Sequence, residues 1–367
     1  MNILYLTNHL NIGGITSYVL TLSTGLKKRG HNIYVASSHG QLFSRFTQEG
    51  INYVSIPIKT KKEVSPKILA SMFKLLYAVK QYNIDIVHSN SRTTGVLGCL
   101  LSRRTGIPHV STCHGFFKKR LLRKLFPCWG QKTIAISEQV KEHLIKDFSI
   151  DEERIKVIHN GIDVEKYAIR NTQYAIRKRK ELGLGDGPVV GIVARLSDVK
   201  GHTYLIQAMK NVLESMPQAQ LLIVGEGKKK QELVKLVNAL EIQKNIFFIP
   251  SVTETTEVLS IMDIFVLPSL KEGLGLSLME AMASGLAVIG SDVGGIKSLI
   301  QDGNNGLLVK PADSVSLSGG ILELLGNAKK REYFGNNARD FISKNFSQEE
   351  MVTQTERVYL ECASLKQ

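Results

Sequence analysis

The chain has 367 residues, 43% hydrophobic and 22% charged, which is an ordinary globular composition at a length typical of two domains. No apolar run approaches the roughly 20 residues needed to cross a bilayer, and the N-terminal MNILYLTN lacks the basic segment of a secretory signal. These features exclude an integral membrane protein and predict a cytoplasmic location. Four scattered cysteines without metal-type spacing fit that reducing compartment and predict no metal site.

The net charge of +14 is concentrated in the first half of the chain. Residues 1–185 carry 29 Lys and Arg and 12 Asp and Glu, a net +17, whereas residues 186–367 carry 18 and 21, a net −3. A basic first half favours an anionic partner, which would be a membrane surface, a phosphorylated acceptor or nucleic acid. Charge that serves only solubility is the alternative.

Short β-branched runs alternate with helical patterns through the first half. This alternation predicts βαβ units and a parallel sheet that is covered on both faces. The expected strands are residues 2–6, 32–37, 53–58, 85–90, 109–114, 133–137 and 156–160, and the expected helices are Ser17–Lys28, Lys67–Tyr82 and Glu138–Lys146.

A polar segment rich in Lys and Arg, about Val164–Gly187, separates this half from a second alternating series. We therefore predict an α/β fold of two doubly wound Rossmann-like domains facing across a cleft, residues 1–168 and 186–345, with a C-terminal helix (about 346–367) packing back on the first. The second series has expected strands at 189–196, 221–227, 245–251, 264–269, 287–292 and 306–309, and expected helices at His202–Glu214, Lys229–Leu240, Leu276–Ser284, Arg331–Lys344 and Gln348–Ser364.

Ligands of open parallel sheets bind beyond the carboxyl ends of the strands. The stretch from Pro268 to Gly295 follows such a strand and contains Glu272 in a glycine-rich turn and Glu280 in the next helix. Glycines let the backbone approach a ligand, and a helix N-terminus adds unpaired N–H groups with partial positive charge. We expect phosphate or sugar oxygens at this turn.

Two cations flank a short turn after the first strand of the second half. Arg195 and Lys200, in RLSDVKG, suit a leaving diphosphate on which negative charge develops. A solvated pair of surface cations is the alternative interpretation.

Weaker signals follow three strands of the first half. Gly13-Gly14 precedes a helix and could present amides to a diphosphate, although a tight strand-to-helix turn explains it equally well. It is not the G-x-G-x-x-G fingerprint, so a nicotinamide oxidoreductase is disfavoured. His114 ends a strand and is a candidate sugar or phosphate contact, with a structural histidine as the alternative. Asn160-Gly161 is a weak candidate or only a turn.

A basic amphipathic pattern, FFKKRLLRKLF, follows His114. It is typical of an interfacial helix on anionic lipid, or equally of a surface helix packed on the sheet. The cations that would contact a membrane or an acceptor are Lys118, Lys119, Arg120, Arg123 and Lys124.

Taken together and in order, these motifs resemble family 4 retaining glycosyltransferases of the GT-B architecture over nearly the whole chain. The most specific is EGLGLSLME, which fits the Glu-x7-Glu signature through Glu272 and Glu280. RLSDVKG fits the family's Arg and Lys motif, NIGG its glycine loop, and NGID the turn that closes its first domain.

The resemblance implies a role for each matching position. Gly14 would approach the donor diphosphate, which Arg195 and Lys200 would neutralise, while Glu280 would bind the ribose. His114 would lie near the reacting carbon. Further contacts to the donor would come from Glu272, Leu274, Gly275 and Leu276 at the sugar and phosphate, and from Ser251 and Val252 at the base.

The implied reaction moves a sugar from a nucleoside-diphosphate sugar, UDP favoured over GDP, to a glycan or lipid-linked acceptor in surface polysaccharide or lipopolysaccharide-type synthesis. It would retain the anomeric configuration without metal or cofactor, on an enzyme that also contacts the inner face of a membrane. A double displacement through Glu272 is not supported, because Glu280 is assigned to the ribose. The alternatives are a nucleotide-sugar epimerase, another GT-B enzyme, and a basic protein binding anions or nucleic acid.

Overall fold

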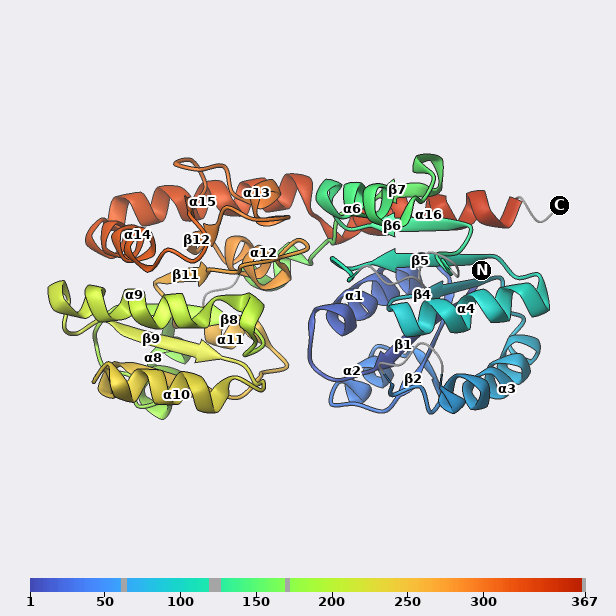
Figure 1. Ribbon diagram of the computed structural model, residues 1–367, viewed down its shortest axis with the longest axis horizontal. Coiled ribbons are helices and arrows are strands. Elements are labelled where there is room, and N and C mark those ends of the chain that lie inside the picture. Colours follow the sequence, from blue (N-terminus) through green and yellow to red (C-terminus); the bar gives the residue numbers. More distant parts are fainter. Residues whose placement is uncertain (61–64, 119–126, 169–171, 365–367) are drawn as a thin grey trace. The chain divides into compact units, whose positions relative to one another are not determined.

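A computed structural model of the protein describes residues 1–60, 65–118, 127–168 and 172–364. The chain divides into two compact units, Met1–Gly161 with Gln348–Gln367, and Ile162–Ser347. Each unit contains one parallel sheet with helices on its faces (Figure 1). The predicted pair of doubly wound domains is confirmed in this architecture.

The first unit is built on a seven-stranded sheet in the order β3-β2-β1-β4-β5-β6-β7. Its central strand β1 pairs in parallel with β2 and β4, where Ile3 lies opposite Ile33 and Ile86. All seven predicted strands are present. The helical layers bury the central strands β1, β4 and β5 almost completely, whereas the edge strand β3 is only partly buried. The strands are β1 Asn2–His9, β2 Asn32–Ser38, β3 Asn52–Ser55, β4 Ile86–Ser89, β5 His109–Cys113, β6 Lys132–Ala135 and β7 Ile155–Val157.

The helices of the first unit include the last helix of the chain. The buried face of α16 packs against α1, and its Tyr359 hydroxyl lies 2.7 Å from that of Tyr5 in β1. The expected return of the C-terminal helix to the first domain is therefore confirmed. The helices are α1 Gly14–Lys28, α2 Phe43–Gln48, α3 Pro66–Gln81, α4 Arg92–Thr105, α6 Glu138–Phe148 and α16 Gln348–Ser364, with the 3-10 turn η1 Glu152–Arg154.

The second unit is built on a six-stranded parallel sheet in the order β10-β9-β8-β11-β12-β13. Its strands are β8 Val189–Val193, β9 Gln220–Val224, β10 Ile246–Ile249, β11 Ile264–Leu267, β12 Ala287–Ser291 and β13 Leu307–Val309. Its helices are α7 Val164–Ala168, α8 Thr172–Glu181, α9 His202–Ser215, α10 Lys230–Ala239, α11 Thr255–Leu259, α12 Leu276–Ala283, α13 Ile296–Leu299, α14 Ser314–Gly326 and α15 Ala328–Asn345, with the 3-10 turns η2 Asp198–Lys200 and η3 Gln243–Asn245.

Two long helices were missed by sequence reasoning because glycine lowers helix propensity. In α4, Gly98 lets the helix lie directly on β5, since an added Cβ would be 2.5 Å from the ring of His109. In α14, Gly320 faces the sheet, where an added Cβ would meet Ile289 and Leu307 at 3.5 Å. Tertiary packing outweighs local propensity at both helices.

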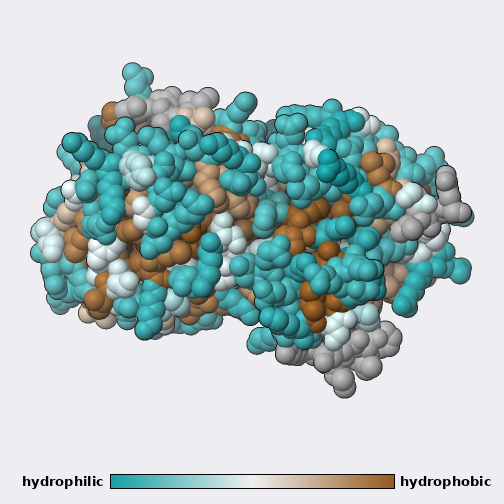
Figure 2. All heavy atoms as spheres, turned by 90° about the horizontal axis from the view of Figure 1, so that it is seen from above, coloured by the Kyte–Doolittle hydropathy of each residue, from teal (hydrophilic) through white to brown (hydrophobic). Residues whose placement is uncertain are grey.

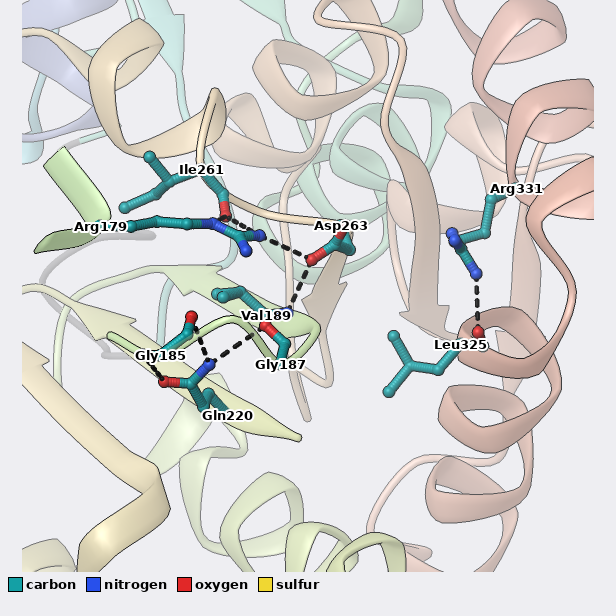
Figure 3. Close-up of polar contacts among 9 residues, drawn as sticks. All are labelled: Arg179, Gly185, Gly187, Val189, Gln220, Ile261, Asp263, Leu325 and Arg331. Atoms are coloured by element: carbon teal, nitrogen blue, oxygen red, sulfur yellow. Dashed lines mark hydrogen bonds and ion pairs between the residues drawn. The ribbon is translucent and has the colours of Figure 1, made fainter. Parts of the chain in front are cut away.

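The segment expected to cross between domains is partly helical and belongs to the second unit. Arg179 of α8 is ion-paired with Asp263 at 2.9 Å, and Asp263 also accepts a bond of 2.8 Å from the Val189 amide (Figure 3). Beside them, the Gln220 side chain bonds the backbone at Gly185 and Gly187 (Figure 3). These contacts attach α8 to the amino end of β11, and the loop that follows α8 to the amino end of β9.

The surface mixes polar and apolar side chains. Hydrophilic residues cover much of the face drawn in Figure 2, with groups of hydrophobic residues between them. Within the described residues, no helix is both long and apolar enough to span a bilayer.

Candidate functional site

Two loops meet at the carboxyl edge of the second sheet. The loop after β8 runs from Ala194 to Gly201, and the loop after β11 runs from Pro268 to Gly275. They are joined by a bond of 2.8 Å from the Leu270 amide to the Val199 carbonyl. Gly201 has a φ of +71°, and an added Cβ would be 1.8 Å from the Pro268 carbonyl oxygen. Only glycine fits there, which explains the Lys-Gly pair that ends RLSDVKG.

The meeting of these loops brings Lys200 and Glu272 into an ion pair between Nζ and Oε2. The side chains are 21% and 13% exposed, so solvent screens the pair only in part. Buried Ser269 also lies 3.2 Å from Glu272 through its hydroxyl. The two residues that the sequence assigned to phosphate and sugar are therefore neighbours, and Ser269 is a partner that the sequence reasoning missed.

Glycines hold the Glu272 turn in place from behind. Gly294 has a φ of +47°, and an added Cβ would be 2.0 Å from the Glu272 carbonyl oxygen. A Cβ on Gly295 would be 2.2 Å from the Gly273 oxygen, and the Gly295 amide donates to Glu272 O at 3.2 Å. The DVGG sequence therefore supports the turn that carries the carboxylate.

Helix α12 begins directly after this turn. Gly275 precedes it with a φ of +104°, and the first helical residue is Leu276. The side chain of Leu274 is buried, so this residue presents its backbone to the turn. The first N–H groups of a helix have no partner within it and suit an anion beside a cation such as Lys200.

Arg195 occupies an exposed position in the loop after β8. The backbone on either side of it is fixed by the GEG loop that follows β9, because Ala194 and Leu196 donate 3.0 Å bonds to the carbonyls of Val224 and Glu226. A Cβ on Gly225 or Gly227 would lie 2.1 Å from the carbonyl oxygens of Ala194 or Leu196. The Arg195 backbone is rigidly placed while its side chain stays accessible.

Glu280 lies inside α12 with little exposure. Burial raises the pKa of its carboxyl group to about 7, against which hydrogen bonds from Thr255 and Tyr167 and the charge of Lys166 act. The Tyr167 hydroxyl lies 3.3 Å from the Thr255 hydroxyl, and burial raises the pKa of that phenol too. Sequence reasoning missed Tyr167 and Thr255, which lie in the short helices α7 and α11 that pack against α12.

The two residues assigned to the base, Ser251 and Val252, lie in the loop after β10 and are half-buried. This loop follows an edge strand of the second sheet. No described contact links them to Lys200 or Glu272.

In the first unit, His114 follows β5 at the carboxyl edge of the sheet. Its Nε2 lies 3.3 Å from Oδ1 of Asn90, which follows the neighbouring strand β4, and its ring meets that of Tyr18 edge-on with centroids 4.6 Å apart. Burial lowers the pKa of His114 to about 3, so the imidazole is neutral at pH 7. Because the Asn90 Oδ1 can only accept a hydrogen bond, this contact selects the His114 tautomer that carries its hydrogen on Nε2.

Gly13-Gly14 leads from β1 into α1. A Cβ added at either glycine would meet no atom within 4 Å, so packing does not require glycine there. At Asn160-Gly161 the asparagine is buried, and its Oδ1 lacks a hydrogen-bond partner among the described residues.

The predicted interfacial helix falls mostly on Lys119, Arg120, Arg123 and Lys124, which lie outside the described residues. Lys118 is described and exposed. In the part of the chain that the structure covers, no group of three or more His, Cys, Asp or Glu is arranged to hold a metal ion.

Both halves of the chain match families of glycosyltransferases. Residues 12–166 match the model of Glycosyltransferase Family 4, and residues 175–341 match that of Glycosyl transferases group 1. The chain is 30% identical over 311 residues to the UDP-Gal:alpha-D-GlcNAc-diphosphoundecaprenol alpha-1,3-galactosyltransferase of Escherichia coli, covering 80% of this chain and 79% of that protein. It is 25% identical over 351 residues to the capsular polysaccharide biosynthesis glycosyltransferase CapM of Staphylococcus aureus, covering 91% of both.

Among solved structures, that of Anabaena HepE in complex with UDP and glucose is similar, with a TM-score of 0.87 at 23% identity. The match covers 97% of this chain and 98% of that one. The likeness establishes the GT-B fold.

Proposed function

The chain belongs to the family 4 glycosyltransferases, and we propose that it transfers a sugar, with retention, from a UDP-sugar to a glycan or lipid-linked acceptor. The observation that carries this proposal is the meeting of Lys200 and Glu272 at the start of α12. A diphosphate beside Lys200 would place its sugar at the Glu272 carboxylate. Arg195, from the same loop, would add a second cation.

In this proposal the leaving diphosphate is stabilised by protein cations and helix amides. Lys200, Arg195 and the first amides of α12 would bind the negative charge that develops as the glycosidic bond breaks. No metal or cofactor is needed in this scheme. The diphosphate itself would help to deprotonate the acceptor on the same face of the sugar, which gives retention.

We assign the remaining contacts residue by residue, as the resemblance to the family implies them. Glu280 would accept bonds from the ribose hydroxyls, and Ser251 and Val252 would contact the base. In the first unit the open turn at Gly14 would let the diphosphate approach the backbone. Neutral His114, whose Nε2 donates to Asn90, would accept a bond near the reacting carbon through Nδ1.

The choice of UDP and of a lipid-linked or polysaccharide acceptor is supported by the relatives. The E. coli relative is named for UDP-Gal and a diphosphoundecaprenol-linked acceptor, and the S. aureus relative for capsular polysaccharide. We accordingly place this enzyme in surface glycan synthesis, in the cytoplasm at the inner face of the membrane.

A panel of UDP- and GDP-sugars, each with and without EDTA, tests the proposal. We expect turnover of one UDP-sugar, unchanged in EDTA, with an α-linked product from an α-linked donor by proton NMR of the anomeric position. Loss of activity in EDTA would overturn the metal-free scheme, and an inverted product would overturn retention. An epimerised donor without transfer would indicate the epimerase instead. Binding of duplex DNA without turnover of any donor would indicate a nucleic-acid protein.

A further inference from the structure

The outer face of α3 carries an unusual stripe of exposed hydrophobic residues. Leu69, Phe73 and Tyr77 are 62%, 67% and 70% exposed. Their spacing of four residues places them along one side of the helix over about 12 Å. Other large hydrophobic side chains with comparable exposure, such as Ile176 and Val315, lie singly on other helices.

The stripe is not the packing face of α3. Ile68, Leu75 and Val79 point inward and belong to the core formed with β1 and β4. Helix α3 is therefore apolar on two sides, and the core accounts for only one of them. A contiguous exposed patch of this kind marks an interaction surface.

A shallow groove runs beside the stripe. Its volume is about 540 Å³, and it lies between α3 and the edge strand β3. Phe73 and Tyr77 line one wall, and Tyr53 and Val54 line the other. The surface therefore offers apolar recesses as well as protruding side chains.

The charges around the stripe are all of one sign on this helix. Helix α3 carries Lys67, Lys74 and Lys80 and no acidic residue. Lys74 also lines the groove, with its Nζ 3.4 Å from the Ser55 carbonyl oxygen. Residues 51–118 as a whole contain ten Lys and Arg and two Asp and Glu.

We propose that the α3 stripe (Leu69, Phe73 and Tyr77) with its flanking lysines docks on an anionic phospholipid bilayer. Exposed aromatic and aliphatic side chains gain by entering the boundary between headgroups and acyl chains, and lysines beside them are attracted to lipid phosphates. A second copy of the chain fits less well. A two-fold contact through α3 would bring the lysines of both copies together without a carboxylate on the helix to pair with them.

This inference specifies the surface for the membrane contact of the proposed function. It rests on the proposed function only for the reason to dock, which is to reach a lipid-linked acceptor. Binding to vesicles needs neither donor nor acceptor, and turnover of a donor in solution needs no vesicle. Either property can therefore fail while the other stands.

Vesicle flotation of the full-length protein tests the assignment. Binding to phosphatidylcholine vesicles that contain phosphatidylglycerol is expected, with weak binding to pure phosphatidylcholine. The variant Leu69→Ser/Phe73→Ser/Tyr77→Ser should lower the bound fraction at least about tenfold. The matched control Ile176→Ser/Val315→Ser/Leu360→Ser removes similarly exposed side chains elsewhere and should bind like the wild type.

A charge variant separates the two contributions. Lys67→Gln/Lys74→Gln/Lys80→Gln should reduce binding at least about tenfold at low salt and leave a weak, salt-independent remainder. Because these residues are exposed, circular dichroism of all variants should match that of the wild type.

Three results would overturn the proposal. The first is equal flotation of the stripe variant and its control. The second is loss of binding in Lys118→Gln/Lys119→Gln/Arg120→Gln with no loss in the stripe variant, which would assign docking to the basic segment. The third is a wild-type dimer in analytical ultracentrifugation that the stripe variant converts to monomer without effect on vesicle binding.

Discussion

The carboxyl edges of the two sheets differ in the charge of their candidate residues and in how tightly their loops pack. At the second edge a cation and a carboxylate form an ion pair, and glycines press their loops against one another. At the first edge the candidate residues are neutral. They are the His114 imidazole with the Asn90 amide and the Tyr18 ring beside it, and the Gly13-Gly14 turn, which has open space beside it. The candidate residues at the edge of the second sheet are therefore charged, whereas those described at the edge of the first sheet are neutral.

Removing the charged pair should have the largest effect on activity. Lys200→Ala and Glu272→Ala are each expected to lower kcat/KM about 10²–10³-fold, because in the proposed site each would remove a contact to the developing charge or to the sugar. The matched control is Lys229→Ala, whose lysine pairs with Asp198 and Glu232 and is assigned no ligand. Steady-state kinetics that leave Lys200→Ala unimpaired would assign the pair a structural role.

Two glycines at positive φ, one in a packed loop and one in open space, should differ in what an alanine substitution costs in unfolding free energy. Gly294→Ala should destabilise the protein by about 2 kcal/mol or more in urea unfolding, because the new Cβ meets the Glu272 carbonyl at positive φ. Gly303 has a φ of +72° but no atom within 4 Å of an added Cβ, so Gly303→Ala should cost only about 1 kcal/mol. Equal losses in the two variants would argue against the packing account.

At the Gly13-Gly14 turn, by contrast, an alanine should affect donor binding and not reduce stability. Gly14→Ala should leave stability unchanged or raise it by up to about 1 kcal/mol, since Gly14 begins α1 and its surroundings are empty. Donor KM should rise about tenfold if the diphosphate approaches this backbone. Gly319→Ala, in α14 with equally open space, is the matched control and should leave KM unchanged.

Loss of the neutral His114 side chain should have a moderate effect on activity, and this residue should not make the wild-type rate depend on pH. His114→Ala should lower kcat/KM about tenfold to a hundredfold. Because the pKa of His114 is lowered to about 3, the wild-type rate should show no break from this residue between pH 5 and 8. Asn90→Ala should lower the rate less. An inflection near pH 6.5 that disappears in His114→Ala would contradict the neutral imidazole.

Glu280 should affect stability in a way that is visible only as a dependence on pH. Its pKa is raised to about 7 by burial, so folding favours the protonated carboxyl, and the stabilisation is complete below the usual value near 4.5 and lost as the pH rises through about 7. From this group alone, unfolding free energy should be higher at pH 4.5 than at pH 8 by up to about 3 kcal/mol. In Glu280→Gln that component should vanish. Identical pH profiles in urea unfolding would count against the raised pKa.

Much of the fold was readable from the sequence because buried parallel strands are short apolar runs ended by turn residues. The site was readable only in pieces. Lys200 and Glu272 are 72 residues apart, and their contact depends on β8 and β11 being neighbours, a pairing that opposes Val190 to Ile264. Local patterns carry no information about which strands pair. Helix α4 was hidden by its glycines, and Tyr167 was hidden in a segment interpreted as a crossing.

The return of α16 to the first unit has a consequence for biosynthesis. The second unit is continuous, Ile162–Ser347, whereas the first needs Gln348–Gln367 to complete it. Tyr359 supplies the hydrogen-bond partner of buried Tyr5 and of His88, at 2.7 and 2.5 Å. A nascent chain therefore makes the first sheet early but closes its core last, after the second unit has left the ribosome, and a chain that stops at Ser347 would keep Tyr5 and His88 without that partner.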